Sequence, residues 1–405
     1  MSASSSSRTD GAEALCRHFG SCGGCAIQNL PYPDQLKFKA EKLARLMSRL
    51  GAPEPVVHPS PQTRFYRNKM EFSFGKAGDG GRLHLGLKVR KSFSRVLDLE
   101  ECLLSSPETP RLLGAVREWA ARRGLKPYDA RDHSGLLRHV IVREAKSSAE
   151  SGERMVGLIA APGDIDPGAF AEAVTAAYPA SSVWIGWNAK PSDTAVADAI
   201  LPVQGSPSIV ETLFVAGREL SFKLSPYSFF QTNTKAAEVL YGQIVEWAGL
   251  SGAESVLDVY SGSGGIALSM AGSIAKVSAL EMNPQAVADA TENAARNGVG
   301  NVRFYEGTSE LLLAALLDTA PDLVVVDPPR AGLMPRALKA LLASPPPRLL
   351  YVSCNPGTLA RDVAALVPFF RPERLALVDM FPHTEHLESA LLLSRVSAPK
   401  SSVKP

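Results

Sequence analysis

An apolar strand candidate runs directly into a glycine-rich turn in the sequence Val256-Leu257-Asp258-Val259-Tyr260-Ser261-Gly262-Ser263-Gly264-Gly265. Glycine lets a chain turn sharply and lets a ligand approach the backbone. The next strand candidate ends at Glu281, whose carboxylate can accept hydrogen bonds from two ribose hydroxyls. The order Gly-x-Gly-Gly is not a full dinucleotide fingerprint, and a tight turn without a ligand is the alternative interpretation. The pattern therefore indicates a candidate nucleoside site.

Strand and helix candidates alternate regularly around this turn. The strands are expected at 255–259, 276–280, 302–305, 323–326, 349–352 and 374–378, and a last apolar strand follows Glu388. Helices are expected between them at 284–297, 309–317, 335–342 and 358–366. Such alternation predicts a parallel sheet with helices on both faces, and ligands on these sheets bind at the carboxyl ends of the strands. We expect a Rossmann-like α/β domain over residues 216–405.

The first half of the chain has a different pattern. Helices are expected at 33–50, 109–123 and 169–177, and strands near 70–74, 83–87, 138–144, 155–160 and 183–187. Glycines at 78–81 suggest a turn between the first two strands. This pattern predicts an α+β region over residues 15–215. Residues 1–14 are Ser-rich and lack large apolar residues, so we expect a disordered tail there.

The composition excludes several classes of protein. The chain has 405 residues, of which 45% are hydrophobic and 21% are charged, so wholesale disorder and fibrous structure are excluded. No apolar run approaches the roughly 18 residues that span a bilayer, and the start of the chain lacks the apolar segment of a secretion signal. We expect a cytoplasmic monomer. The net charge of +2 neither indicates nor excludes a nucleic-acid partner.

Five cysteines are too few, and odd in number, for a disulfide framework. Cys16, Cys22 and Cys25 lie close together in the sequence, and Cys102 could complete a set of four thiols. Four thiols suit either a structural zinc ion or a [4Fe–4S] cluster, and ordinary unliganded thiols are the alternative. The spacing indicates a metal without indicating which one.

Two further strand candidates end in polar motifs. Asp327-Pro328-Pro329-Arg330 follows one of them, and the two prolines make a rigid shelf. Methyltransferases that act on exocyclic amines place an aromatic residue after such a pair, so Arg330 argues against amine methylation. The next strand opens at Ser353-Cys354-Asn355-Pro356. Cys354 is a candidate nucleophile, and a small buried hydrophobic residue is the alternative.

Glu388 enters the last apolar segment of the chain. Unpaired burial would raise its pKa, which suits a general base, whereas a salt-bridged or exposed glutamate is the alternative. His383 and His386 precede it, but this pair lies off a helix and is weak evidence for a metal. We expect these two histidines to pack in a loop.

The motifs together resemble the RNA uracil-5 methyltransferase family, whose members make 5-methyluridine. They occur in the family's order, as Phe229-Phe230-Gln231-Thr232-Asn233, residues 258–264, Asp327-Pro328-Pro329-Arg330, Ser353-Cys354-Asn355-Pro356 and Pro382-His383-Thr384-Glu385-His386-Leu387-Glu388. One departure is Ser261, where the family usually has cysteine. That position lines the cofactor loop, so the expected activity is little affected.

The resemblance implies a mechanism. Cys354 attacks C6 of uracil, C5 takes a methyl group from S-adenosylmethionine (SAM), and Glu388 removes the C5 proton. The resemblance also implies that five residues hold SAM or the uracil: Gln231, Tyr260, Gly265, Glu281 and Asp327. Cytosine-5 methylation uses similar chemistry and is a close alternative, but the Ser-Cys-Asn-Pro motif followed by a terminal Glu resembles the uracil branch. A non-catalytic iron–sulfur RNA sensor is the alternative from another class.

One branch of the family has the same cysteine spacing and carries a [4Fe–4S] cluster, so the resemblance favours iron–sulfur at Cys16, Cys22, Cys25 and Cys102. The resemblance also favours 23S rRNA as the substrate, with tRNA second. Many rRNA-acting members carry an extra N-terminal β-barrel, which the 15 residues before Cys16 cannot form. We expect RNA to bind at residues 64–95, where nine Lys and Arg accompany two acidic residues and interleaved aromatics. A solvated sheet face over an aromatic core is the alternative.

Overall fold

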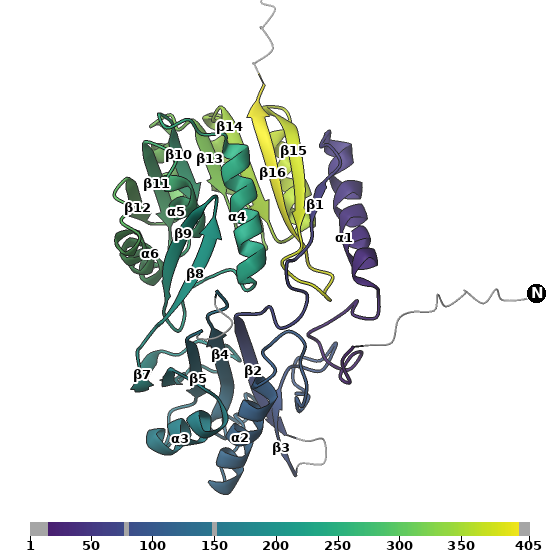
Figure 1. Ribbon diagram of the computed structural model, residues 1–405, viewed down its shortest axis with the longest axis vertical. Coiled ribbons are helices and arrows are strands. Elements are labelled where there is room, and N and C mark those ends of the chain that lie inside the picture. The colour runs from purple at the N-terminus through teal and green to yellow at the C-terminus, as the bar shows by residue number, and fades with distance from the viewer. Residues whose placement is uncertain (1–14, 77–80, 148–151, 397–405) are drawn as a thin grey trace, which may run out of the picture.

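The computed structural model describes residues 15–76, 81–147 and 152–396. Two sheets make up most of the molecule, and Figure 1 shows the N-terminal sheet below the C-terminal sheet. The expected disordered tail at 1–14 lies outside the described residues, as does most of the glycine turn at 78–81.

The C-terminal sheet has, within the described residues, the strand order β1-β15-β16-β14-β13-β10-β11-β12. The strands are β1 (Val56–His58), β10 (Ser255–Val259), β11 (Lys276–Glu281), β12 (Val302–Glu306), β13 (Leu323–Val326), β14 (Arg348–Ser353), β15 (Phe370–Val378) and β16 (Glu388–Arg395). Neighbouring strands run parallel except at β16, which is antiparallel to β14 and β15. The Rossmann-like prediction is confirmed, but the expected all-parallel sheet is wrong at β16. The loop between β15 and β16 is too short for a parallel crossover.

Helices cover both faces of this sheet, as the sequence predicts. They are α4 (Thr234–Ala248), α5 (Gly265–Ala271), α6 (Pro284–Arg296), α7 (Ser309–Leu317), α8 (Pro335–Ala343) and α9 (Pro356–Leu366). Successive strand residues point to opposite faces. Val256 accordingly packs with α4 and α5 in one core, and Leu257 packs with α7, α8 and α9 in another.

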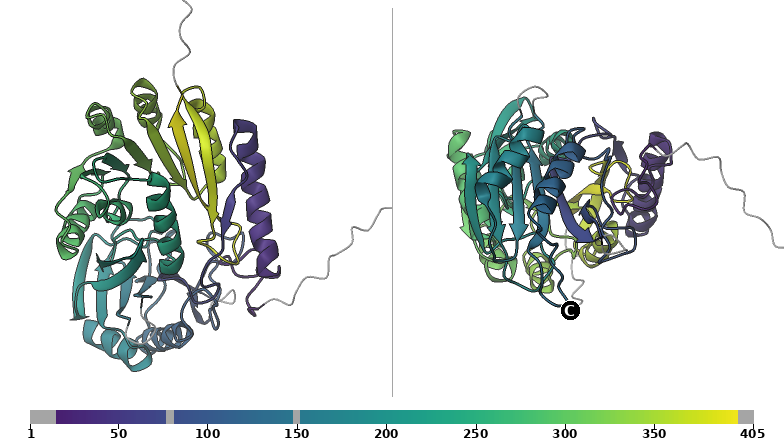
Figure 2. Two further views of the ribbon diagram at one scale, coloured as in Figure 1. Left: turned by 45° about the horizontal axis from the view of Figure 1, so that its top comes forward. Right: turned by 90° about the horizontal axis from the view of Figure 1, so that it is seen from below.

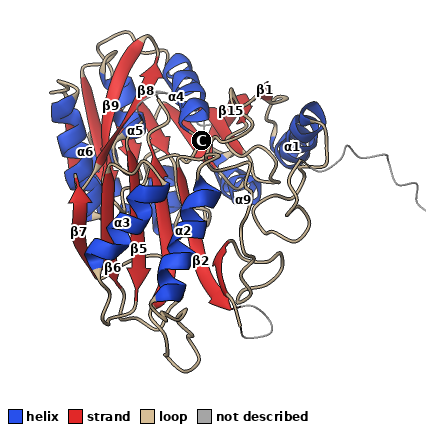
Figure 3. Cartoon of the chain, turned by 60° about the horizontal axis from the view of Figure 1, so that its bottom comes forward, coloured by secondary structure: helices blue, strands red, loops and turns tan. Residues whose placement is uncertain are grey.

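The N-terminal sheet has, within the described residues, the order β3-β2-β4-β5-β6-β7. Its strands are β2 (Lys69–Lys76), β3 (Leu83–Gly86), β4 (Leu137–Glu144), β5 (Arg154–Ala160), β6 (Ser182–Trp187) and β7 (Ala199–Gly205). Helices α2 (Thr109–Arg122) and α3 (Pro167–Ala177) pack on one face (Figure 3). Ile141 and Trp184, on the opposite face, share a core with α4 and with the hairpin of β8 (Ile209–Val215) and β9 (Arg218–Leu224). The two halves of the molecule are therefore joined by continuous apolar packing.

Helix α1 (Tyr32–Met47) and the short 3-10 helix η1 (Ser48–Leu50) lie beside the C-terminal sheet (Figure 2). Leu43 and Met47 pack into the same core as α9, and β1 pairs with β15 in parallel. Residues 32–58 thus belong structurally with the C-terminal sheet, although they precede residue 215 in the sequence. No helix among the described residues is long and apolar enough to cross a membrane.

Candidate active site

One edge of the C-terminal sheet collects most of the predicted site residues. Tyr260 follows β10, Glu281 ends β11, and Asp327 follows β13, and these strands are parallel to one another. Cys354 follows β14, which runs parallel to β13. Glu388 begins β16, and because β16 is antiparallel to β14 its first residue lies at the same edge. The structure therefore brings five predicted residues together at one sheet edge.

Cys354 and Glu388 lie next to each other at the end of the β14–β16 ladder. The last residue pair of this ladder is Ser353 with Ser389, and Cys354 and Glu388 are the residues directly beyond it on the two chain segments. The Ser389 hydroxyl donates to the Ser353 carbonyl over 3.0 Å, which fixes the register at this end. Hydrogen-bonded strands on both sides of β16 hold the carboxylate in place.

The electrostatics of this pair are dominated by burial. Glu388 is 2% exposed, and its Oε1 has no hydrogen-bond partner among the described residues. Burial and the neighbouring Asp327 raise the pKa of Glu388 well above its ordinary value, and Arg330 opposes the shift. Burial likewise raises the pKa of Asp327 to about 7. Burial, Glu388 and Asp327 raise the pKa of the Cys354 thiol to about 11, against the influence of Arg330.

A cavity of about 230 Å³ opens beside Cys354. Its walls come from four places in the chain: α1, the loop after β13, the start of α9, and the loop that precedes β16. Lys42 and Leu46 line it from α1. Sequence reasoning missed both residues, because an amphipathic pattern shows that a helix has an inner face without showing what it packs against.

The glycine-rich turn adopts the conformation that its sequence requires. Tyr260, Gly262 and Gly264 have positive φ angles of 68°, 55° and 88°. The Gly262 N–H donates to Glu281 Oε2 over 3.0 Å, and the Asn283 N–H donates to Oε1 over 2.8 Å. Backbone donors therefore hold the Glu281 carboxylate at the turn. The hydroxyl of Tyr260 lies 2.9 Å from Ser309 Oγ. The tight turn is confirmed, and its contact with SAM stays a prediction.

The packing around residue 265 explains why this position is a glycine. A Cβ at this position would lie 2.6 Å from the hydroxyl of Tyr241, so only glycine fits against α4. Asp258, just before the turn, is fully buried, and burial, Asp327 and Glu281 raise its pKa to about 8. Close packing of α5 against α4 thus explains Gly265 without a ligand contact.

Gln231 is buried in a segment that joins the two halves of the molecule. Its carbonyl accepts a hydrogen bond from Asn68 Nδ2 over 2.8 Å, and Asn68 Nδ2 also donates to Thr234 Oγ1 over 2.9 Å. Two residues earlier, the Phe229 carbonyl accepts from Ser263 Oγ over 2.8 Å. These contacts hold the Gln231 segment against the glycine-rich turn.

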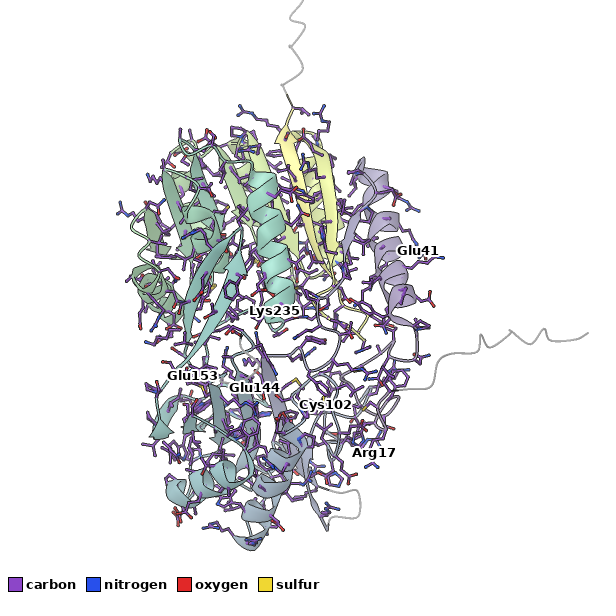
Figure 4. The ribbon with its side chains drawn as sticks, viewed as in Figure 1. Arg17, Glu41, Cys102, Glu144, Glu153 and Lys235 are labelled. Atoms are coloured by element: carbon purple, nitrogen blue, oxygen red, sulfur yellow. The ribbon has the colours of Figure 1, made fainter. Side chains whose placement is uncertain are left out.

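The four N-terminal cysteines line one small cavity, which is formed by residues 16–28, Leu87 and residues 99–104; Figure 4 labels Cys102. All four thiols are free. Burial and then the three other thiols raise the pKa of Cys25 to about 12. As the side chains stand, no group of three or more His, Cys, Asp or Glu in the described part of the chain is arranged to hold a metal ion. In a [4Fe–4S] cluster each thiolate binds a different iron, so its ligands stand further apart than those of a single ion. The assignment of a [4Fe–4S] cluster to these four thiols stays a prediction.

The structure also tests two other predictions from the sequence, one about the histidines near Glu388 and one about the aromatic residues of the basic segment. His383 is 3% exposed and its Nδ1 lies 3.3 Å from Gln35 Nε2, which confirms loop packing for this residue. The same prediction is wrong for His386, which is exposed and lines the cavity beside Cys354. In the basic segment at 64–95, Phe72 and Phe74 lie in the core of the N-terminal sheet. The stacking role expected for these two rings is therefore wrong, because alternate residues of β2 face α2. Phe93, by contrast, is 97% exposed.

Comparisons with known proteins identify the family of the chain. Residues 203–396 match the family model described as tRNA (Uracil-5-)-methyltransferase. The chain is 38% identical over 399 residues to an uncharacterized RNA methyltransferase of Nitratidesulfovibrio vulgaris, covering 95% of this chain and 83% of that protein. It is 34% identical to another from Caldanaerobacter subterraneus, covering 95% and 85%. The fold and these relatives define a SAM-dependent RNA methyltransferase.

A solved structure extends the similarity to both halves of the chain. It is the Pyrococcus abyssi tRNA (uracil-54, C5)-methyltransferase in complex with S-adenosyl-L-homocysteine, with a TM-score of 0.74 and 29% identity over 92% of this chain and 86% of that one. The chain belongs to the RNA (uracil-5-)-methyltransferase family, and it is an enzyme.

Proposed function

We propose that this enzyme methylates C5 of a uridine in RNA, with Cys354 as the nucleophile and Glu388 as the general base. The observation that carries this proposal is that Cys354, which lines a cavity, and the buried Glu388 lie directly beyond the last residue pair of the β14–β16 ladder, close enough for Glu388 to raise the pKa of the thiol. One reactive thiol and one buried carboxylate are the two groups that the reaction requires.

The chemistry follows from the weakness of the uracil ring as a nucleophile. The Cys354 thiolate adds to C6, and the electron pair of the C5–C6 bond becomes available at C5. C5 then forms a bond to the methyl group that SAM would supply, as the bond from sulfur to that methyl breaks and S-adenosylhomocysteine leaves. Glu388 takes the C5 proton, and the returning electron pair expels the thiolate. Because C6 is covered in a base stack, the target uridine is extruded or already unpaired.

Burial favours the protonated forms of Cys354 and Glu388 in the free enzyme, so the reaction requires that each group loses its proton before it acts. Glu388 has a raised pKa, so it holds a proton more firmly than an exposed carboxylate and is a stronger base once ionised. Arg330 favours the charged forms of both Glu388 and Cys354. When bound, SAM supplies the methyl group and a positive sulfonium. Gln231, Tyr260, Gly265, Glu281 and Asp327 form the set that we propose holds SAM and the uracil.

The four N-terminal cysteines are proposed to hold a [4Fe–4S] cluster with a structural role. Their shared cavity, their free thiols and their mutual effect on pKa support this assignment. Four protein thiolates leave no open iron position for radical chemistry. In this proposal residues 15–215 hold the cluster and contact RNA, and residues 216–405 carry the SAM site.

For the substrate, we propose 23S rRNA first, on the strength of the cysteine spacing. A uridine in tRNA is the second candidate, because the similar Pyrococcus abyssi structure is described as a tRNA methyltransferase. Mapping 5-methyluridine in total RNA from a deletion strain tests both. Loss of one site in 23S rRNA would support the first candidate, loss of one tRNA site the second, and no loss in either would contradict the proposal.

A further inference from the structure

The loop between β15 and β16, residues 379–387, forms one wall of the active-site cavity. Glu385, His386 and Leu387 line the cavity together with Cys354, and the loop leads directly into Glu388. Its conformation therefore sets where the uracil ring can lie relative to the thiol and the carboxylate.

Helix α1 presents polar side chains to this loop. Tyr32, Gln35 and Lys39 are spaced three and four residues apart, so they share one helix face. Gln35 is 1% exposed and Lys39 is fully buried. Glu41, in contrast, lies on the outer side of the helix (Figure 4). An amphipathic helix normally buries apolar groups, so a buried face with these polar residues needs a specific partner.

The first partner is the start of the loop. Lys39 Nζ lies 2.6 Å from Asp379 Oδ1 and also donates to the Phe381 carbonyl over 2.9 Å. The Tyr32 hydroxyl donates to Asp379 Oδ2 over 2.9 Å. Both side chains of the Lys39–Asp379 ion pair are buried. Because water cannot solvate either charge, the ion pair and these hydrogen bonds must offset the cost of burying them.

The second partner is His383, whose φ of 68° places it in the left-handed region. Its N–H donates to Gln35 Oε1 over 2.8 Å. Its carbonyl accepts from the N–H groups of Ala26 and Ile27, over 2.9 and 3.1 Å, directly after Cys25. A non-glycine residue persists in this conformation only where its surroundings hold it. The cysteine-rich segment and α1 together provide that hold.

We propose that Gln35 and Lys39 are positioning residues for the methyl-transfer site: they hold the loop that walls the uracil cavity and carries Glu388. Neither touches the reacting atoms, and both act through loop backbone atoms or through Asp379. This inference rests on the proposed function. It also explains why residues 26–39, distant in the sequence from the catalytic motifs, are packed against them.

Gln35 offers the sharper test, because its removal leaves no uncompensated charge. In Gln35→Leu, we expect kcat for RNA methylation to fall by about 10- to 100-fold, as a small misplacement of reacting groups does. The KM for RNA should stay within about twofold, and SAM binding should be unchanged. If the loop positions the uracil for proton removal by Glu388 as well as for attack by Cys354, a larger fraction of the enzyme should accumulate as a covalent RNA adduct on denaturing gels.

The controls separate positioning from general destabilisation. Glu41→Leu on the exposed outer face of the same helix should match the wild type in both kcat and adduct fraction. Should Gln35→Leu be insoluble, Gln35→Asn, which withdraws the amide by one methylene, should show the same kcat loss and adduct gain. A wild-type kcat in the soluble variant, or an adduct fraction that falls in step with activity, would overturn the inference. A wild-type enzyme that makes no 5-methyluridine would instead overturn the proposed function.

Discussion

The ammonium group of Lys39 lies 2.6 Å from the Asp379 carboxylate, and neither side chain is exposed to solvent. Removing one partner would leave the other charge buried without compensation. We therefore expect Lys39→Met to lower the free energy of unfolding by about 3–5 kcal/mol, measured by urea denaturation. Arg122→Met, which breaks the exposed Arg122–Glu118 pair, is the matched control and should change it little. A Lys39→Met protein as stable as the control would contradict the account.

Burial raises the pKa of the Cys354 thiol to about 11, and this has a kinetic consequence. An ordinary thiol has a pKa of 9.0, so burial and the neighbouring Glu388 and Asp327 keep Cys354 protonated to higher pH. Alkylation of the ligand-free enzyme by iodoacetamide should thus rise about tenfold per pH unit from pH 7 to pH 10, because only the thiolate reacts. Mass spectrometry of the Cys354 peptide measures the rate. An alkylation rate that levels off below pH 9 would contradict the raised pKa of the Cys354 thiol.

Asp258 makes stability depend on pH. Its pKa in the folded protein is raised from 3.8 to about 8, so the folded state binds the proton more tightly than the unfolded state. The contribution is fully present below pH 4 and is lost as the pH rises through 8. Asp258→Asn has no such loss. Its melting temperature relative to the wild type should therefore increase from pH 5 to pH 8, and a constant difference would argue against a buried, protonated Asp258.

The cysteine cavity predicts a metal content. Purified without oxygen, the protein should be brown and contain about four irons per chain, and Cys25→Ser should lose most of them. Iron and zinc analysis on the same sample measures both metals. One zinc with no iron would contradict the cluster assignment. The Glu41→Leu protein, altered on the outer face of α1, is the control for loss of metal during purification and should keep the wild-type iron content.

The sequence predicted the sheet edge well, because polar motifs directly after apolar strands mark the carboxyl ends of parallel strands. Cys354, Asp327 and Glu281 were placed in this way. Glu388 was recognised as unusual from its apolar surroundings alone. That it lies next to Cys354 depends on β16 being antiparallel, which the sequence pattern did not predict.

Tertiary contacts explain what the sequence did not predict. β1 is a strand of three residues, Val56–His58, too short to show an alternating pattern, yet it joins the C-terminal sheet. The contact of Lys39 with Asp379 joins residues 340 positions apart. The sequence of β2 alone does not show which of its two faces α2 covers. Phe72 and Phe74 were therefore expected to be available for stacking on bases, although they lie on the covered face.

The roles of Cys354 and Glu388 are tested most directly by the Glu388→Gln variant, incubated with SAM and substrate RNA and resolved on a denaturing gel. Without a base to remove the C5 proton, the thioether to C6 should persist, so we expect a protein–RNA band and almost no released 5-methyluridine. Glu388→Gln combined with Cys354→Ala should give no band. Full methylation by Cys354→Ala alone, or no adduct with Glu388→Gln where the wild type is active, would contradict the mechanism.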